Sequence, residues 1–236
     1  RAPAAPAPTL RLLPPEPMAR PLVLIDLPGA GQTSVAVAAP FVAQGAADRR
    51  IGLVANAVLG GGYSARLNQL VRIQRGLSYG ASSAAEAFAG GGMVAAQCQT
   101  NHPNAAEVLA LLQGEITRLA EAPPSAAELA ARQATLVGGF ARRLETTAGL
   151  SAVLVAQWAA GRPLADLSDH VPQILAVTPA QVQAFARQHW QATALRAVVV
   201  GDLAAAGATL GAQTPDALRL RMAEVDLEQA GLRKPG

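Results

Sequence analysis

The 236-residue sequence predicts an α+β domain, a mainly antiparallel sheet with helices packed on one face. Strand-like runs come in pairs, one pair on each side of a helical stretch, as antiparallel neighbours do. The long stretch 103–190 then shows helical periodicity alone before one last strand-like run. With 51% hydrophobic and 15% charged residues, the chain has enough apolar surface to fill a core.

The first elements are strand pairs and short helices. Runs 21–27 and 33–40 are rich in β-branched residues around a Pro-Gly-Ala-Gly turn, which predicts a hairpin. Asp48 then caps a predicted helix that ends at the glycines 60–62, interpreted as a flexible stop. Ser64 is predicted to cap a second helix, which carries Leu67, Leu70 and Val71 inward and stops at Gly76.

The remaining elements follow from the same signals. Two strands are expected around a second glycine run, and a capping box of Ser125 and Glu128 opens the longest helix. The predicted ranges are strands 77–89 and 92–100, helices from 103, from 125, at 148–160, 166–176 and 179–190, and a strand at 195–202. No internal repeat is visible.

Helical and strand periodicity also predict the core. Its expected members are apolar residues on the inward faces: Val23, Ile25, Val35, Val37, Val54, Val58, Leu67, Leu70, Val198, Val199 and Val200. Arg72 is not among them, because it points about 140° away from Leu67 on a helical wheel.

Composition argues against several kinds of protein. The net charge is +3, the positive charge is nearly all arginine and is scattered along the chain, and aromatic residues make up 3%, so no stacking platform for nucleic acid is expected. The longest apolar stretch, 148–161, falls short of the ~18 residues that span a bilayer and contains Gln157. Cys98 is the only cysteine, which permits no internal disulfide.

No self-sufficient active site emerges from the residue chemistry. His102, His170 and His189 are isolated from one another, and neither HExxH nor HxxEH occurs. There is no GxSxG, and the glycines 60–62 end a helix rather than open one, so they do not form a phosphate loop. No metal ligand and no cofactor-binding residue is therefore expected in this chain.

One block of the sequence resembles a known family. Residues 56–83, NAVLGGGYSARLNQLVRIQRGLSYGASS, are similar to the signature of the C-terminal half-domains of the pitrilysin and mitochondrial-processing-peptidase family, the zinc peptidases with an inverted motif. The pattern N-x-x-L-G-G-G-x-S-S-R-L-x-x-x-x-R-x-x-x-G-L-x-Y is met except at Ala65, where the family has serine. The resemblance extends over about residues 20–203, including the opening strands and the last strand.

The resemblance implies a processing-peptidase-like half-domain. Such proteins pair two homologous halves, and an HxxEH helix in one of them holds zinc. The corresponding helix here, 51–59, has no His or Glu, so the resemblance implies a metal-free half that is inactive alone. It also implies that Arg72 and Tyr79 act at the zinc site of a partner half, binding substrate backbone and stabilising the oxyanion.

The implied partners are a zinc-bearing half-domain or subunit of the same family and a peptide substrate, in a homo- or heterodimer at full length. The zinc motif can lie upstream in the same polypeptide or in a separate subunit. The alternative is a non-catalytic peptide-binding or scaffold subunit. In that case Arg72 is an ordinary exposed helix arginine and Tyr79 a half-buried strand aromatic.

Three regions are predicted: a Pro/Ala-rich linker at 1–19, the half-domain at 20–203 and a C-terminal tail at 204–236. Within the tail, LRLRMAEVDLEQAG (218–231) is expected to form a short helix. The arginine-rich, lysine-poor composition suggests a GC-rich bacterial genome and favours the periplasm slightly over the cytoplasm.

Overall fold

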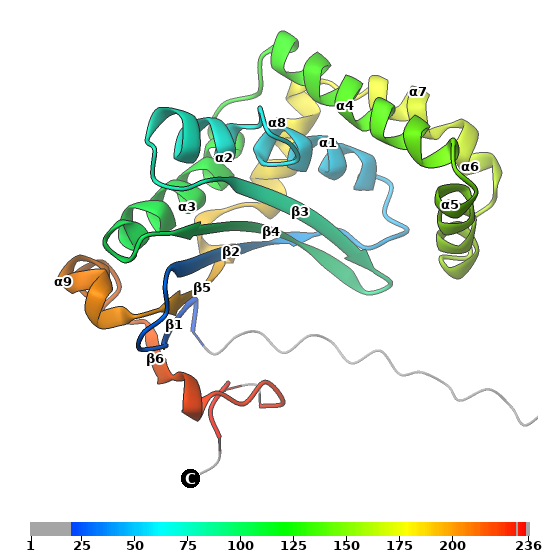
Figure 1. Cartoon of the computed structure of the whole chain (residues 1–236). Coiled ribbons are helices and arrows are strands. Elements are labelled where there is room, and N and C mark those ends of the chain that lie inside the picture. The colour runs from blue at the N-terminus through cyan, green and yellow to red at the C-terminus, as the bar shows by residue number, and fades with distance from the viewer. Residues whose placement is uncertain (1–19, 230, 235–236) are drawn as a thin grey trace, which may run out of the picture.

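A computed structural model describes residues 20–229 and 231–234, so the predicted linker 1–19 lies outside the described residues. Its centre is a six-stranded sheet in the order β3-β4-β2-β5-β1-β6 (Figure 1). The strands are β1 (Leu22–Asp26), β2 (Thr33–Phe41), β3 (Ala81–Phe88), β4 (Gly91–Thr100), β5 (Arg196–Gly201) and β6 (Leu218–Arg221). Antiparallel pairing joins β3, β4, β2 and β5, whereas β5–β1 and β1–β6 are parallel. The prediction of an α+β fold with a mainly antiparallel sheet is confirmed.

Most helices form a layer over one face of this sheet (Figure 1). The α-helices are α1 (Arg49–Leu59), α2 (Arg66–Asn68), α3 (Ala105–Glu121), α4 (Ala126–Leu144), α5 (Thr147–Ala159), α6 (Ala165–Ser168), α7 (His170–Leu175), α8 (Pro179–His189) and α9 (Leu203–Gln213). Shorter turns are the π-helix η1 (Gln69–Gln74) and the 3₁₀ helices η2 (His102–Asn104), η3 (Ala192–Ala194) and η4 (Met222–Glu224). Helices α1, α3 and α8 contact the sheet directly, whereas α4 lies on α1 and carries α5 at its far end.

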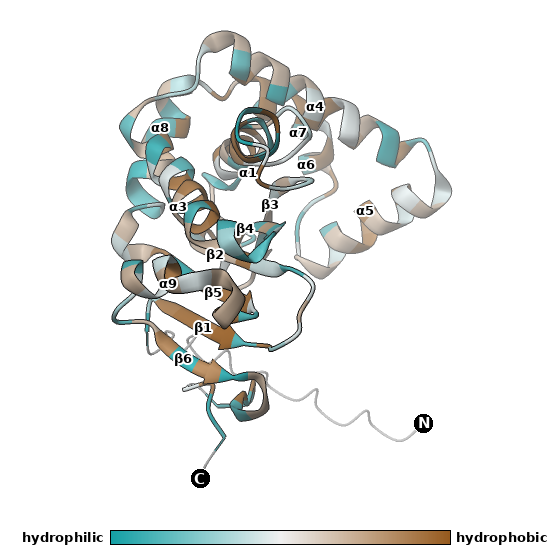
Figure 2. Cartoon of the chain, turned by 60° about the vertical axis from the view of Figure 1, so that its left-hand side comes forward, coloured by the Kyte–Doolittle hydropathy of each residue, from teal (hydrophilic) through white to brown (hydrophobic). Residues whose placement is uncertain are grey.

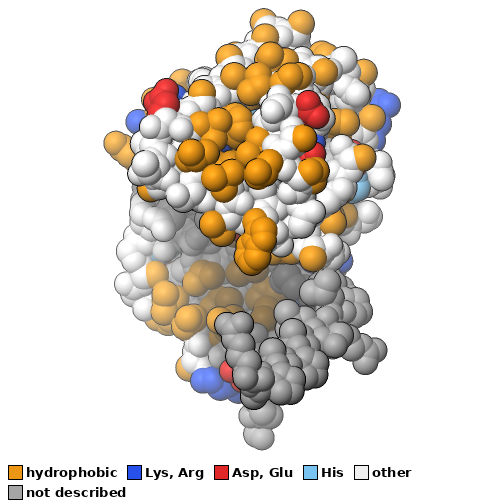
Figure 3. All heavy atoms as spheres, turned by 90° about the vertical axis from the view of Figure 1, so that its right-hand side faces the viewer, with side chains coloured by type: hydrophobic (Ala, Val, Ile, Leu, Met, Phe, Trp, Pro, Cys, Tyr) orange, Lys and Arg blue, Asp and Glu red, His pale blue; other side chains and the backbone are white. Residues whose placement is uncertain are grey.

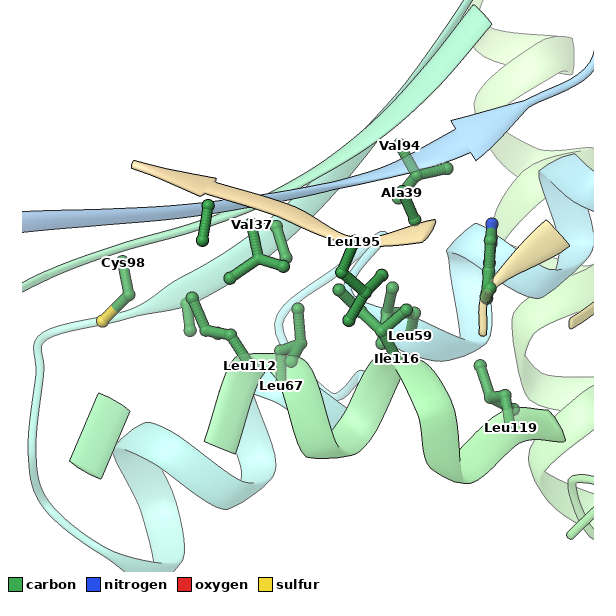
Figure 4. Packing of buried hydrophobic residues seen from close by; sticks show 14 of the residues in the cluster. Val37, Ala39, Leu59, Leu67, Val94, Cys98, Leu112, Ile116, Leu119 and Leu195 are labelled. Atoms are coloured by element: carbon green, nitrogen blue, oxygen red, sulfur yellow. The ribbon is translucent and has the colours of Figure 1, made fainter. Parts of the chain in front are cut away.

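The main core lies between the sheet and these helices (Figure 4). Alternate residues of β2, such as Val35 and Val37, are fully buried on the face that meets Leu112 and Ile116 of α3. Full burial of each such side chain contributes about 1.5–3 kcal/mol. The sequence therefore predicted the core correctly where strand alternation and helical periodicity agree.

A second, smaller apolar cluster lies on the opposite face of the sheet. Val23, Ile25 and Leu220 form it, with Val225 and Leu232 of the C-terminal segment packed against them. Figure 2 shows β1 as a strongly apolar strand at this end of the sheet, with β6 beside it. Val23 and Ile25 are thus buried as predicted, but away from the helices.

Three other predicted core residues are only half-buried: Leu70, Val198 and Val200. The two valines face the second cluster, because alternate residues of β5 point to opposite faces and only Val199 meets the helices. Leu70 lies in the π-helix η1, where the wider turn leaves Val71 as the fully buried residue.

The predicted hairpin of the first two strands is wrong. Strand β5 lies between β1 and β2 and pairs with both. β5 takes this central place because it is apolar on both faces, as strands covered on both sides are. The loop after β1 is instead tied to the end of β5, where the Gly29 N–H donates to Asp202 Oδ2 at 3.1 Å.

Two predicted caps are also wrong. The Asp48 side chain makes no capping bond, and its carboxylate lies 3.6 Å from His189 Nε2. Helix α2 begins after Ala65, while the Ser64 hydroxyl accepts a bond from Arg132.

The predicted capping box is half right. The Ser125 hydroxyl accepts from the Glu128 N–H at 3.1 Å as expected, but the Glu128 carboxylate turns to Arg66. The helix predicted at 218–231 is likewise replaced by β6 and η4. Alternation in LRLR explains this, since Leu220 is buried while Arg219 and Arg221 are exposed.

Candidate donor site on the helix–turn–strand segment

The candidate site lies on residues 56–83, called here the motif segment, which runs from the end of α1 through α2 and η1 into β3 (Figure 1). The π-helix η1 carries Arg72 and ends at Gln74, and Gly76 two residues later has a φ of 62°, the left-handed conformation that glycine adopts most readily. Single π-helical turns occur frequently at functional sites. Tyr79 follows in the loop two residues before β3 begins, not within the strand.

Arg72 and Tyr79 lie side by side at the surface. The Arg72 guanidinium carbon is 4.6 Å from the centre of the Tyr79 ring and 5.0 Å from the centre of the Tyr63 ring. The two rings therefore hold the guanidinium by cation–π contacts, each contributing about 0.5–1 kcal/mol at an exposed position. Tyr79 is 88% exposed and Tyr63 62% exposed. Tyr79 is consequently not the half-buried strand aromatic of the alternative interpretation.

Hydrogen bonds fix the loops that carry the two tyrosines. The amide of Asn68, which is 4% exposed, donates to the Tyr63 carbonyl at 2.6 Å and accepts from the Ala81 N–H at 3.3 Å. The Ser78 hydroxyl donates to the Gln99 carbonyl of β4 at 2.5 Å. Both ring-bearing loops are thus anchored to buried or sheet atoms, which sets their spacing around Arg72.

The glycine run has a packing role rather than the flexible one predicted. The Ser83 N–H donates to the Gly60 carbonyl at 3.0 Å, and the Ser83 hydroxyl donates to Asn56 Oδ1 at 2.7 Å. A Cβ on Gly60 would lie 2.5 Å from the Ser83 nitrogen, and one on Gly61 would lie 2.7 Å from the Ala57 Cα. Only glycine lets the end of α1 approach β3 this closely.

Helix α4 braces the other side of the segment. Arg66 donates two bonds to the Glu128 carboxylate, at 2.7 and 2.8 Å, and Arg132 donates to the Ser64 hydroxyl at 2.7 Å. These bonds from Arg66 lower the pKa of Glu128 and raise the pKa of Arg66. Most of the fixed residues of the motif therefore hold the fold together. Of its two fixed arginines, Arg66 is paired with Glu128, whereas Arg72 has no such partner among the described residues.

Arg72 has no ion pair and no side-chain hydrogen bond within the described part of the chain. Its guanidinium offers five N–H donors and Tyr79 offers one O–H, which suits binding to carbonyl oxygens or to an oxyanion. The pair can stabilise developing negative charge but cannot activate water.

Within the part of the chain that the structure describes, no set of side chains fits a zinc ion. Helix α1 carries no His, Asp, Glu or Cys, and within residues 20–229 and 231–234 no three such side chains converge. The histidines make other contacts: His102 bonds Thr33 Oγ1 at 2.8 Å, and His170 stacks on Phe140 with ring centres 4.2 Å apart.

Sequence reasoning missed two residues of this site, Tyr63 and Asn68. Tyr63 occupies a variable position of the motif, so the pattern gave it no weight. Asn68 could have been noticed as an amide facing inward between Leu67 and Val71, a position that requires hydrogen-bond partners.

The described residues thus form an α+β domain with hydrogen-bond donors at its surface and no cluster of metal-ligating side chains. The chain belongs to the peptidase M16 inactive domain family, which matches residues 2–136. It is the inactive half of a member of this zinc protease family, as its resemblance implied. The comparison with curated proteins gave no match.

Solved structures of the same fold agree with this assignment. A peptidase M16 inactive domain from Pseudomonas fluorescens is 27% identical, with a TM-score of 0.75 over 84% of this chain and 47% of that one. A protease from Helicobacter pylori is 18% identical, with a TM-score of 0.75 over 84% and 48%. A chain of complex III2 from Candida albicans is 14% identical, with a TM-score of 0.67 over 77% and 46%. This chain spans about half the length of these proteins.

No described helix is long and apolar enough to cross a membrane.

Proposed function

We propose that this chain is the zinc-free half of a zinc metalloendopeptidase, in which Arg72 and Tyr79 bind substrate backbone and stabilise the oxyanion at a zinc site on a partner half-domain. The observation that carries this proposal is the stack of the half-buried Arg72 side chain against two exposed tyrosine rings, with no carboxylate partner among the described residues. Membership of the inactive-domain family supports it.

The two donors suit different parts of the reaction. Zinc on the partner half would supply a Lewis acid and an activated water. Negative charge then collects on the substrate carbonyl oxygen, and the Tyr79 hydroxyl would donate to it as it forms. The planar Arg72 guanidinium would grip the backbone carbonyls of the bound peptide in the ground state as well as in the transition state.

The stack prepares Arg72 for this role. A free arginine loses about 0.5–1.5 kcal/mol of rotamer entropy on being fixed at an interface. Contacts with Tyr63 and Tyr79 already restrict the guanidinium, while the bonds of Asn68 and Ser78 hold the loops. The donors would therefore meet the substrate with little rearrangement.

Complementation tests the proposal. The purified chain is mixed with the zinc-bearing half, obtained from the same polypeptide or from a companion subunit, and cleavage of an unfolded peptide is measured. We expect neither half alone to cleave, the mixture to cleave, and Arg72→Ala in this chain to remove most of the gain. Full activity of the zinc-bearing half without this chain would contradict the proposal.

A scaffold role is the second candidate. The apolar surface of α5, where Trp158 is 80% exposed, supports it. The same mixing experiment separates the two roles. Formation of a stable complex of both halves, with zinc bound and no cleavage, would favour the scaffold.

A further inference from the structure

A second feature, independent of the motif segment, is a partly open cavity of about 370 Å³ lined by residues from the start of α1, the end of α4, α5 and the segment from α6 to α7. Four arginines line it: Arg49, Arg50, Arg143 and Arg162. Its apolar walls include Leu53, Phe140, Val153 and Leu167. Figure 3 views the side of the molecule that carries α5, where apolar side chains predominate and arginines show mainly at the margins.

Two of these arginines have buried nitrogens that lack a partner. Arg49 Nε and Arg50 Nε are shielded from solvent and make no hydrogen bond within the described part of the chain. Burial, followed by the charges of Arg162 and Arg50, lowers the pKa of Arg49. A buried donor left unpaired costs about 1–3 kcal/mol, and more when it is charged. A hydrogen-bond acceptor placed beside these nitrogens would therefore be stabilising.

The carboxylates nearby do not balance the arginines. Asp166 is the only acidic side chain lining the cavity among the described residues, and it is already bonded to Arg162, with Arg162 Nη2 at 2.8 Å from its Oδ2. Arg50 reaches only the Asp166 carbonyl, at 3.4 Å. Asp169, which does not line the cavity, raises the pKa of Arg50, but by less than burial and the charge of Arg162 lower it. The cavity keeps a net positive charge.

His170 also lines the cavity, and its pKa is sensitive to this positive charge. Burial lowers its pKa to about 4, with smaller contributions from the four arginines that face it. The imidazole is therefore neutral at pH 7, where it can still donate one N–H to a ligand. A bound anion would offset the arginine charges and raise the pKa of His170.

We infer that this cavity binds a small, multiply charged oxyanion, a compound carrying phosphate or carboxylate groups, through Arg49, Arg50, Arg143 and Arg162. The guanidinium fork matches both groups in two-point hydrogen bonds. The volume lies within the range of small-molecule sites, and apolar side chains form part of the wall, as is usual for such sites.

Calorimetric titration of the whole chain with pyrophosphate or citrate, at fixed ionic strength, tests the site. It also shows whether the site binds phosphate or carboxylate groups. We expect at least one probe to bind below about 1 mM and to raise the melting temperature. Arg49→Gln should weaken that binding about tenfold or more, because it removes a charge that makes no hydrogen bond in the described structure. Arg142→Gln, one residue before the lining Arg143 on α4 and outside the lining, is the matched control.

The histidine gives a second readout that can be taken on the wild-type chain, where no substitution disturbs folding. In NMR titrations the pKa of His170 should rise from about 4 toward its ordinary value when the binding probe is present, in wild type and in Arg142→Gln. Failure of both probes to bind at about 10 mM would overturn the inference. Equal affinity of wild type and Arg49→Gln for the probe would overturn it as well. An unchanged pKa of His170 in the presence of the bound probe would also overturn it.

Discussion

The motif segment and the arm formed by α5 with the turn after it (residues 146–164) both present side chains to solvent, but they are held differently. The motif segment is fixed from several sides by Asn68, Ser78, Ser83 and the α4 arginines, and Leu67 beneath it is fully buried. The arm packs mainly on α4. The comparison indicates that this domain rigidly positions one pair of exposed side chains and leaves another exposed surface weakly supported.

The difference should appear first in stability. Leu67→Ala removes a fully buried side chain beneath η1, and we expect a loss of about 2–5 kcal/mol in the free energy of unfolding. Val155→Ala on α5, where the side chain is 61% exposed, should change it by less than about 0.5 kcal/mol. Urea denaturation of both variants measures this contrast. Similar losses for the two would mean that the arm is as tightly packed as the motif segment.

A smaller loss is expected from the buried amide. Asn68→Ala leaves the Tyr63 carbonyl and the Ala81 N–H without their partner and should cost about 1–3 kcal/mol. Hydrogen exchange at the Ala81 amide should quicken at the same time. Asn104→Ala is the control, because its side chain makes no capping bond. Unchanged exchange at Ala81 would show that Asn68 does not anchor the loop.

One glycine in each region has the same backbone conformation, which allows the two regions to be compared with the same substitution. Gly76 in the motif segment and Gly161 in the arm both have φ of 62°, and a Cβ on either would meet nothing within 4 Å. Alanine at each should therefore cost a similar amount, about 1–2 kcal/mol, from the left-handed backbone alone. Peptidase activity of the assembled enzyme should fall only for Gly76→Ala. An equal fall for Gly161→Ala would remove the functional distinction between the regions.

How far the sequence predicted this molecule depends on the range of the interactions involved. Periodicity placed the helices and strands up to β5, and the turn at Gly76 was correct, because these depend on local backbone preferences. Insertion of β5 between β1 and β2 could not be predicted from local signals, since the pairing joins residues about 170 positions apart.

The same reason limited the prediction of the site. Arg72 and Tyr79 were identified through the motif, but the part played by Tyr63 depends on a loop whose position is set by the buried Asn68. The arginine cavity was missed because its residues come from segments that lie far apart in the sequence.

The most direct test of the central claim is the kcat of Tyr79→Phe in the assembly with the zinc-bearing half. The phenyl ring keeps its contact with Arg72, so only the hydroxyl is lost. We expect kcat to fall by about 10²–10³ with KM nearly unchanged, because the hydroxyl acts mainly in the transition state. Arg72→Ala should also raise KM, and Arg72→Lys should restore activity only in part. Tyr63→Phe, whose ring still faces Arg72, should change kcat by less than about threefold. Wild-type kcat for both Tyr79→Phe and Arg72→Ala, in an assembly shown to contain this chain, would contradict the account and leave the pair as ordinary surface residues.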